Sequence, residues 1–185
     1  MPNELQELAE IVRKRSLRVG DFVLSSGKKA SYYLDCRMTT LDPRGAFLIA
    51  SLVLAKMREL KIKADAVGGL TLGADPMAAS IAVVSGIEGN PLPGFIVRKE
   101  AKGHGTQSLI EGTLSKGDRV VIVEDVVTTG GSSLQAITAV KAVGCDVRKV
   151  LAVVDREEGG REALKEQGYP LEAVFTAREL MAAAT

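Results

Sequence analysis

The stretch that decides the fold is VVIVEDVVTTGGSS, from Val120 to Ser133. It begins with four β-branched apolar residues in succession, without the polar alternation of a half-exposed strand. Such a run is typical of a strand that is covered on both faces, as in a parallel sheet. The stretch leads directly into an apolar-periodic segment, Leu134 to Val143, which predicts a helix. The order strand, loop, helix therefore predicts an α/β fold with a mainly parallel sheet.

The loop of this stretch has the composition of a phosphate-binding site. Gly130 and Gly131 allow a tight turn and a close approach of the backbone to a ligand. Thr128, Thr129 and Ser132 offer hydroxyl donors beside the free N–H groups of a helix start, where anions bind. Ligands of open α/β sheets bind at the carboxyl ends of the strands, where this loop is expected. We therefore expect it to hold a phosphate group.

Two acids, Glu124 and Asp125, stand between the apolar run and the loop. Anions beside a phosphate repel it unless they bind something else, and ribose hydroxyl groups or a hydrated magnesium ion would satisfy them. The alternative, in which the acids cap the helix or face solvent, is a common fate for such residues. Because acids, hydroxyls and glycines converge on one strand end, we favour a sugar phosphate with vicinal hydroxyl groups, accompanied by a metal.

Several classes of function are excluded by what the sequence lacks. It contains neither G-x-x-x-x-G-K-[ST] nor a G-x-G-x-x-G after a strand, so neither a Walker-type nor a dinucleotide site is supported. Lys and Arg number 24 and Asp and Glu 23, a net charge of +1, which gives no reason to expect a nucleic-acid partner. The weakly charged stretch 66–87 is interrupted by Gly68, Gly69, Asp75 and Pro76, so no membrane span is expected.

The cysteines indicate a cytoplasmic protein without a zinc site. Cys36 and Cys145 lie far apart and lack metal-ligand spacing, and the chain has a single histidine. We expect both to be reduced, structural thiols. The first residues, MPNELQELAEIV, carry acids early and lack the pattern of a signal peptide.

The length of 185 residues, with 46% apolar content, suits one domain, 1–185. Asp42-Pro43 predicts the start of a long core helix that runs through Leu60, because Asp is a good N-cap and Pro is favoured at the first helical position. The other predicted elements are a helix at 3–14, strands at 17–24 and 31–37, a β-like run at 64–70 that breaks at Gly68-Gly69, a helix at 77–84, a strand at 94–99, an irregular surface loop at 100–112, a strand at 148–154, a helix at 161–167, a strand at 171–175 and a short terminal helix.

Cationic residues gather between positions 98 and 104. Arg98 and Lys99 end the predicted strand 94–99, and Lys102 and His104 lie in the glycine-rich loop after it. A lone histidine is usually a surface residue or a satisfied core residue, but a histidine between two glycines is poor packing material. These four groups on one loop predict a lid for a highly charged anion.

Arg156 follows the predicted strand 148–154, at the same sheet edge as Glu124 and Asp125. An arginine there can form a bidentate pair with the carboxylate of a substrate. A salt bridge to the nearby Glu157 or Glu158 is the competing interpretation.

Four segments, FVLSSGKKASYYLD, RKEAKGHG, VVIVEDVVTTGGSS and VVDREEGG, resemble in this order the motifs of the bacterial orotate phosphoribosyltransferases, a type I phosphoribosyltransferase family. The Lys-x-His-Gly piece separates this family from the purine phosphoribosyltransferases, which share the central loop. The resemblance implies a central, mainly parallel sheet flanked by helices, with a small N-terminal hood contributed largely by residues of about 1–40. It also implies that the aromatic-bearing strand at 31–37 helps to cover the base.

The implied reaction transfers ribose 5-phosphate from 5-phosphoribosyl 1-diphosphate (PRPP) to orotate, giving orotidine 5′-phosphate and pyrophosphate in UMP synthesis. The resemblance assigns catalytic roles to Lys102, His104 and Asp125, and orotate binding to Thr128 and Arg156. The residues that it assigns to PRPP are Arg98, Lys99, Lys102, His104, Glu124, Asp125, Val126, Val127, Thr128, Thr129, Gly130, Gly131 and Ser132.

The resemblance further implies Mg²⁺ carried on the diphosphate without a direct protein ligand. It implies a homodimer with shared sites, in which Arg98, Lys102 and His104 reach the partner's diphosphate and Lys99 serves its own chain. Some relatives carry lysines at positions that match Ser25-Ser26 and Leu72-Gly73, and these positions are left out of the predicted site.

Two other functions remain open at this point. One is a phosphoribosyltransferase for another base, such as a purine, against which the Lys-x-His-Gly loop and Arg156 argue. The other is a non-catalytic regulator that senses PRPP, which would need an added nucleic-acid-binding surface that the sequence does not supply.

Overall fold

The computed structural model describes residues 2–23, 29–100 and 109–182. Within these residues, six strands form one sheet in the order β5-β4-β3-β6-β7-β8. Neighbouring strands are parallel except β5, which runs antiparallel to β4. The strands are β3 (Ala66–Leu70), β4 (Gly94–Val97), β5 (Ile110–Glu111), β6 (Arg119–Val127), β7 (Asp146–Asp155) and β8 (Leu171–Thr176).

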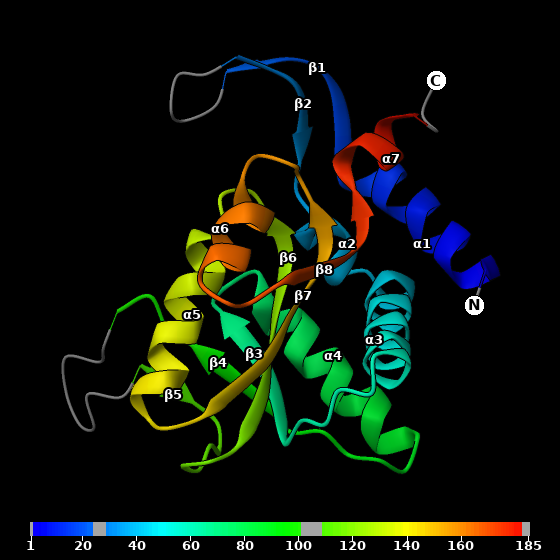
Figure 1. Cartoon of the computed structure of the whole chain (residues 1–185). Helices are drawn as coiled ribbons and strands as arrows, with labels where there is room; N and C mark the ends of the chain where they lie inside the picture. Colours follow the sequence, from blue (N-terminus) through cyan, green and yellow to red (C-terminus); the bar gives the residue numbers. More distant parts are fainter. Residues whose placement is uncertain (1, 24–28, 101–108, 183–185) are drawn as a thin grey trace.

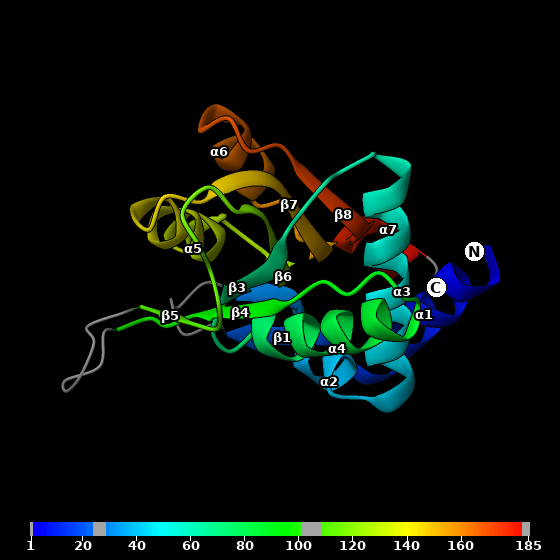
Figure 2. The ribbon, with the colours of Figure 1, turned by 90° about the horizontal axis from the view of Figure 1, so that it is seen from below.

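Helices cover both faces of this sheet, as Figures 1 and 2 show. They are α1 (Pro2–Arg15), α2 (Arg37–Thr40), α3 (Pro43–Glu59), α4 (Ala74–Ile87), α5 (Gly131–Ala142), α6 (Gly160–Glu166) and α7 (Ala177–Ala182). Helices α1, α3, α4 and α7 pack into the core on one face, and α5 and α6 pack into the core on the other. The predicted α/β fold with a mainly parallel sheet is confirmed. None of the helices in the described ranges is long and apolar enough to cross a membrane.

Strand β6 lies between the two cores, which explains its sequence. Val121 and Val123 belong to the core that contains α3 and α4, whereas Val120 and Ile122 belong to the core that contains α5. All four side chains are at most 1% exposed. A strand in this position has no polar face, so the unbroken apolar run follows from burial on both sides.

A two-stranded hairpin, β1 (Leu17–Val23) and β2 (Lys29–Leu34), forms a separate antiparallel sheet. It lies beyond the carboxyl ends of β6 and β7 (Figure 1). The ring of Tyr32, on β2, lies 5.0 Å from the guanidinium carbon of Arg156, which follows β7. The hairpin therefore contacts the sheet edge at which we expect the ligands.

Helix α3 begins as predicted at Asp42. Its carboxylate accepts hydrogen bonds from the N–H groups of Arg44, at 3.1 Å, and Gly45, at 2.9 Å. Pro43 occupies the first helical position, where the missing N–H costs nothing. The cap and the proline together fix the start of the longest helix of the described structure.

The predicted strand 31–37 was wrong at its end, because β2 stops at Leu34 and Arg37 opens α2. Asp35 causes the change of direction: its Oδ1 accepts the backbone N–H of Arg37 at 3.1 Å, and its two oxygens accept the guanidinium at 2.8 Å each. A local side-chain bond to the backbone two residues on is a turn signal that competes with an extended chain.

The predicted break at Gly68-Gly69 was also wrong, since both glycines lie inside β3. A Cβ atom at Gly68 would collide with the carbonyl oxygen of Phe95, and one at Gly69 with that of Val123. Glycine is required here by close packing rather than by a turn.

Other elements differ from the prediction in extent. Helix α4 is longer at both ends than the predicted 77–84, and β6 continues through Val127 instead of ending before the acids. The predicted irregular loop 100–112 contains the short strand β5, and its residues 101–108 lie outside the described residues.

Candidate active site

Loops from neighbouring parallel strands meet at one edge of the sheet. β6 and β7 end side by side, with Val127 opposite Asp155. The N–H of Arg156 donates to the carbonyl oxygen of Val127 at 2.9 Å, and the N–H of Gly160 donates to that of Thr128 at 2.9 Å. The loop after β6 and the loop after β7 are therefore joined by backbone hydrogen bonds into one wall.

The predicted phosphate loop leads into the first turn of α5. Gly130 has a φ of 80°, in the left-handed region that favours glycine, and its carbonyl oxygen accepts the N–H of Leu134 at 2.9 Å. Thr129, Gly131 and Ser132 are exposed. The first turn of α5 thus presents hydroxyl groups and backbone N–H groups to solvent, which is the arrangement that binds phosphate at helix starts.

Gly160 is a position in the wall of the site that was not predicted from the sequence. A Cβ atom at Gly160 would lie 2.7 Å from the carbonyl oxygen of Thr128 and 2.5 Å from Cγ1 of Val127. Any larger residue would push the start of α6 away from the phosphate loop. The double glycine of VVDREEGG was the available signal.

Glu124 and Asp125 lie on opposite faces of β6, because the strand continues past both of them and successive side chains alternate. Glu124 points toward α5, where the Ser133 hydroxyl donates a hydrogen bond to its Oε2. Asp125 points toward the other core, where Gly73 lies so close that a Cβ atom would collide with its Oδ1. The two carboxylates therefore flank the strand end instead of forming one cluster.

Burial favours the protonated form of both carboxylates and so raises their pKa values. Burial raises the pKa of Glu124 to about 7, against hydrogen bonds from Ser133 and Ser132 that lower it. Burial likewise raises the pKa of Asp125, and hydrogen bonds from backbone N–H groups oppose the rise. A ligand that donates hydrogen bonds stabilises the charged form of such an acid, so hydroxyl groups are suitable partners for both.

The turn from Thr71 to Asp75 lies beside Asp125. The Thr71 hydroxyl donates to Oδ2 of Asp75 at 2.7 Å, and the N–H of Asp75 donates to the carbonyl oxygen of Leu72 at 3.3 Å. The absence of a Cβ at Gly73 lets this backbone approach the carboxylate of Asp125. No local sequence pattern predicts this contact, because it joins segments that lie far apart in the chain.

The salt bridge that was the competing interpretation of Arg156 is present in the structure. Its Nη2 lies 2.7 Å from Oε1 of Glu158, whereas Glu157 pairs with Arg178 at 3.0 Å. The guanidinium lies over the ring of Tyr32, a residue that the sequence analysis did not single out. Arg156 is therefore held from two sides, and whether it binds orotate stays a prediction.

Only part of the predicted cationic group falls within the described residues. Arg98 forms an ion pair with Glu111 at 3.3 Å, and the carbonyl oxygen of Lys99 accepts a hydrogen bond from Gln135 of α5 at 3.3 Å. Lys102 and His104 lie outside the described residues. The hydrogen bond from Gln135 links the end of the segment after β4 to the helix of the phosphate loop.

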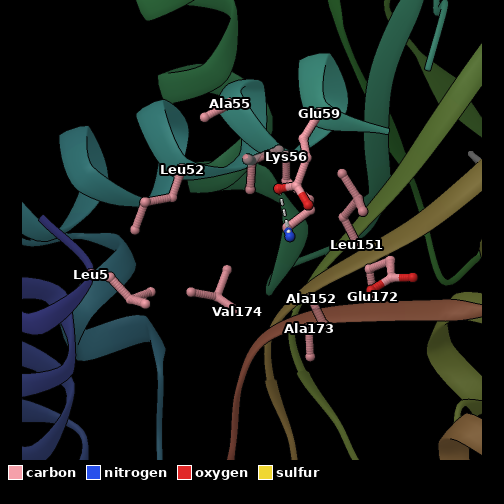
Figure 3. Close-up of a pocket in the computed structure, with 11 residues that line it drawn as sticks. Leu5, Leu52, Ala55, Lys56, Glu59, Leu151, Ala152, Glu172, Ala173 and Val174 are labelled. Carbon is pink, nitrogen blue, oxygen red and sulfur yellow. Dashed lines mark ion pairs between the residues drawn. The ribbon is translucent and has the colours of Figure 1, made fainter. Parts of the chain in front are cut away.

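A pocket of about 390 Å³ lies away from this edge, between α1, α3, β7 and β8 (Figure 3). Its lining is mostly aliphatic, with Leu5, Leu52 and Val174 facing the space and the Lys56–Glu59 ion pair, at 2.8 Å, on α3. No predicted site residue lines it. The polar groups that suit a sugar phosphate thus converge at the open sheet edge and not in the apolar pocket.

The raised pKa of Glu124 predicts how stability depends on pH. The folded chain keeps a proton on Glu124 between the ordinary pKa of 4.5 and about 7, where the unfolded chain has lost it. The contribution of Glu124 to stability is therefore highest below the ordinary pKa and falls as the pH rises to about 7, by up to about 3 kcal/mol. Glu124→Gln should remove this loss. In chemical denaturation, the unfolding free energy of the variant should therefore increase relative to that of the wild type between about pH 5 and pH 8. Glu166→Gln, at an exposed position of α6, is the control; equal behaviour of the two variants would contradict the prediction.

Gly160→Ala tests the contact between the two loops. The added methyl group collides with the Thr128 carbonyl, so we expect a loss of about 1–3 kcal/mol in unfolding free energy and a roughly tenfold weaker binding of ribose 5-phosphate by calorimetry. Gly86→Ala, in α4, adds a methyl group that meets nothing within 4 Å and should leave binding unchanged. Wild-type binding by Gly160→Ala would show that the contact does not shape the site.

Comparisons with known proteins agree with this geometry. The family model of the phosphoribosyl transferase domain matches residues 39–168. The orotate phosphoribosyltransferase of Aquifex aeolicus (strain VF5) is 50% identical over 181 residues, which cover 96% of this chain and 98% of the relative.

Two solved structures of the orotate phosphoribosyltransferase of Mycobacterium tuberculosis H37Rv match equally fully. The complex with Fe(III) dicitrate has a TM-score of 0.86 and 44% identity, and the complex with PRPP has a TM-score of 0.81 and 40% identity. Each match covers 96% of this chain and 98% of the solved chain. With its type I phosphoribosyltransferase fold and these relatives along nearly its whole length, the chain belongs to the orotate phosphoribosyltransferase family.

Proposed function

We propose that the chain transfers ribose 5-phosphate from PRPP to orotate, forming orotidine 5′-phosphate and pyrophosphate in UMP synthesis. The observation that carries the proposal is the joining of two subsites by backbone hydrogen bonds. Gly160 N–H bonds to Thr128 of the phosphate loop, and Arg156 N–H bonds to Val127, so an anion site and an arginine share one wall. The shared wall supports a product that carries a phosphate and a carboxylate, as orotidine 5′-phosphate does.

The 5′-phosphate of PRPP would lie at the first turn of α5, against residues 128–132. Glu124 and Asp125, on the two sides of the strand end, would accept hydrogen bonds from the ribose hydroxyl groups. As pyrophosphate leaves, positive charge develops at C1 of the ribose, and the two carboxylates favour that charge. Both would be ionised with PRPP bound, because hydroxyl donors oppose the effect of burial on their pKa.

Pyrophosphate departs as an anion, so cations must meet it. We assign Arg98, Lys102 and His104 of the neighbouring subunit and Lys99 of the same subunit to this role, with Lys102 and His104 assisting departure. Support comes from the position of Lys99, whose carbonyl oxygen is bonded to α5 of its own chain. The turn at Gly73 would place backbone groups near the diphosphate, on the Asp125 side of the strand.

The oxygen donors at this edge suit a Mg²⁺ ion that arrives bound to the diphosphate of the substrate. Among the described residues, no group of three or more His, Cys, Asp or Glu side chains could hold a metal ion. Magnesium commonly binds substrate phosphates with one or two carboxylates nearby, and Glu124 and Asp125 provide that setting. When bound to the diphosphate, it neutralises part of the charge of the leaving group, and no protein atom is required as a direct ligand.

A homodimer is supported by an apolar surface. On α4, Ala79, Val83 and Ile87 are exposed at helical spacing, and Ile87 is 80% exposed. The neighbouring α2 carries Met38, which is 54% exposed. Apolar side chains that gather on adjacent helices of a monomer mark an interaction surface, and we assign this one to a second copy of the chain.

The cytoplasm is the proposed location. Cys36 and Cys145 are free thiols and both are buried. Unlinked cysteines are what a reducing compartment maintains.

The reaction is tested by the ultraviolet loss of orotate when purified protein, magnesium and PRPP are mixed, with adenine, guanine, hypoxanthine and uracil in parallel. We expect consumption of orotate alone, because only orotate carries a carboxylate for Arg156. Turnover of a purine would indicate another base, and no turnover of any base would indicate a PRPP sensor.

Lys102→Ala should reduce turnover by about 10²-fold or more, since it removes a cation at the departing diphosphate.

The shared site is tested by two inactive variants. Lys102→Ala and Asp125→Asn should each lose activity, and their mixture should regain up to about a quarter of it in the heterodimers that carry one intact site. A mixture that exchanges subunits and stays inactive would refute the sharing of sites.

The proposed interface is tested by Val83→Glu together with Ile87→Glu. Buried charge should convert the dimer, of twice the 19.6 kDa chain mass, into monomers in sedimentation. Val143→Glu, a 45% exposed position at the end of α5, is the control and should stay dimeric. Dimers of the double variant would place the interface elsewhere.

A further inference from the structure

Arg156 is already occupied by a carboxylate of its own loop. Its Nη2 lies 2.7 Å from Oε1 of Glu158, and its guanidinium lies over Tyr32. The Arg156 side chain is only 12% exposed, and its buried Nε has no hydrogen-bond partner in the described structure. A substrate carboxylate that binds this arginine must therefore compete with Glu158.

The other acids of the same loop have different partners. Asp155 is 1% exposed and accepts the N–H of Glu157 and Nε of Arg161, each at 2.8 Å. Glu157 has a φ of 59° and pairs with Arg178 at 3.0 Å. Glu158 is thus the one carboxylate bonded to Arg156 within the described residues.

The two partners of the ion pair differ in their freedom to move. Glu158 is 43% exposed, so its side chain can turn into water without a large desolvation change. The guanidinium of Arg156 lies over the Tyr32 ring, and the side chain is only 12% exposed. When a second carboxylate competes for Arg156, Glu158 is the group that leaves.

We propose that Glu158 stands in for the carboxylate of orotate in the free enzyme and is displaced when orotate binds. The inference rests on the proposed function and assigns to Glu158 a role that sets affinity, with no part in bond breaking. Glu158 keeps the enclosed arginine paired while the site is empty, where an unpaired guanidinium would be unfavourable. It also returns to Arg156 as the product leaves.

Orotate binds only the fraction of enzyme in which Arg156 is free. The apparent dissociation constant of orotate is therefore the intrinsic constant divided by this fraction, which raises it by a constant factor. For an ion pair whose glutamate is 43% exposed and can return to water, this factor is about two to five. The same factor applies to orotidine 5′-phosphate, whose base keeps the carboxylate. It does not apply to PRPP, which carries no carboxylate and whose phosphates are assigned to other groups.

The test compares Glu158→Gln with Glu157→Gln in the full-length enzyme. Glu158→Gln keeps the size of the side chain and removes the charge, so KM for orotate and the product-inhibition constant of orotidine 5′-phosphate should both fall about two- to fivefold, with kcat and KM for PRPP unchanged. Glu157→Gln removes the same charge one residue away and should leave all four constants unchanged.

The outcomes separate the inference from the function on which it rests. An unchanged or higher KM for orotate in Glu158→Gln, with an active wild type, overturns the inference alone. An equal decrease of KM in both variants also overturns it, since that would reflect general repulsion between acids and an anionic substrate. A wild type that consumes no orotate overturns the proposed function.

Discussion

The burial of β6 on both faces is the constraint on which the rest of the molecule depends. Its four apolar residues join two cores that would otherwise be separate, one under α3 and α4 and one under α5. A strand without a solvent face cannot shift its register, because every displaced side chain would meet the wrong neighbours. The acids and the predicted phosphate loop at its end are therefore held by a strand whose register is fixed.

This rigidity allows groups of the same charge sign to share one strand end. Glu124 and Asp125 lie on opposite faces and have different neighbours, so each is influenced mainly by its own burial. The cost of burying two carboxylates would be offset by the hydroxyl groups of a bound ribose, which favour the charged form of each acid. In the free enzyme burial favours the protonated acids, so the binding of PRPP would itself complete the ionisation of the site.

Much of this arrangement could be predicted from the sequence, and the failures share a cause. The run Val120–Val123, the tight turn at Gly130 and the Asp42 cap are local signals, and the structure confirms each of them. Phosphate binding by the loop stays a prediction. The opposite orientation of Glu124 and Asp125 depends on the length of β6, which pairing with β7 extends to Val127. No local pattern contains that information.

The missed positions also depend on distant segments. Gly68 and Gly73 each contact a part of the chain that lies far away in sequence. Gly68 was therefore interpreted as a break in a strand, and no role was predicted for Gly73. Tyr32 was missed as an individual residue because its contact with Arg156 joins two segments that lie far apart in the sequence. Local signals identify the chemistry of the site, and the fold decides which groups face one another.

The stacking of Tyr32 on Arg156 has a practical consequence for spectroscopy. The chain has no tryptophan and three tyrosines, and two of these, Tyr32 and Tyr33, are consecutive residues of β2. The intrinsic fluorescence therefore arises from few emitters, one of which touches the arginine at the sheet edge. The protein carries an optical reporter at that edge, which allows ligand binding to be followed without a label.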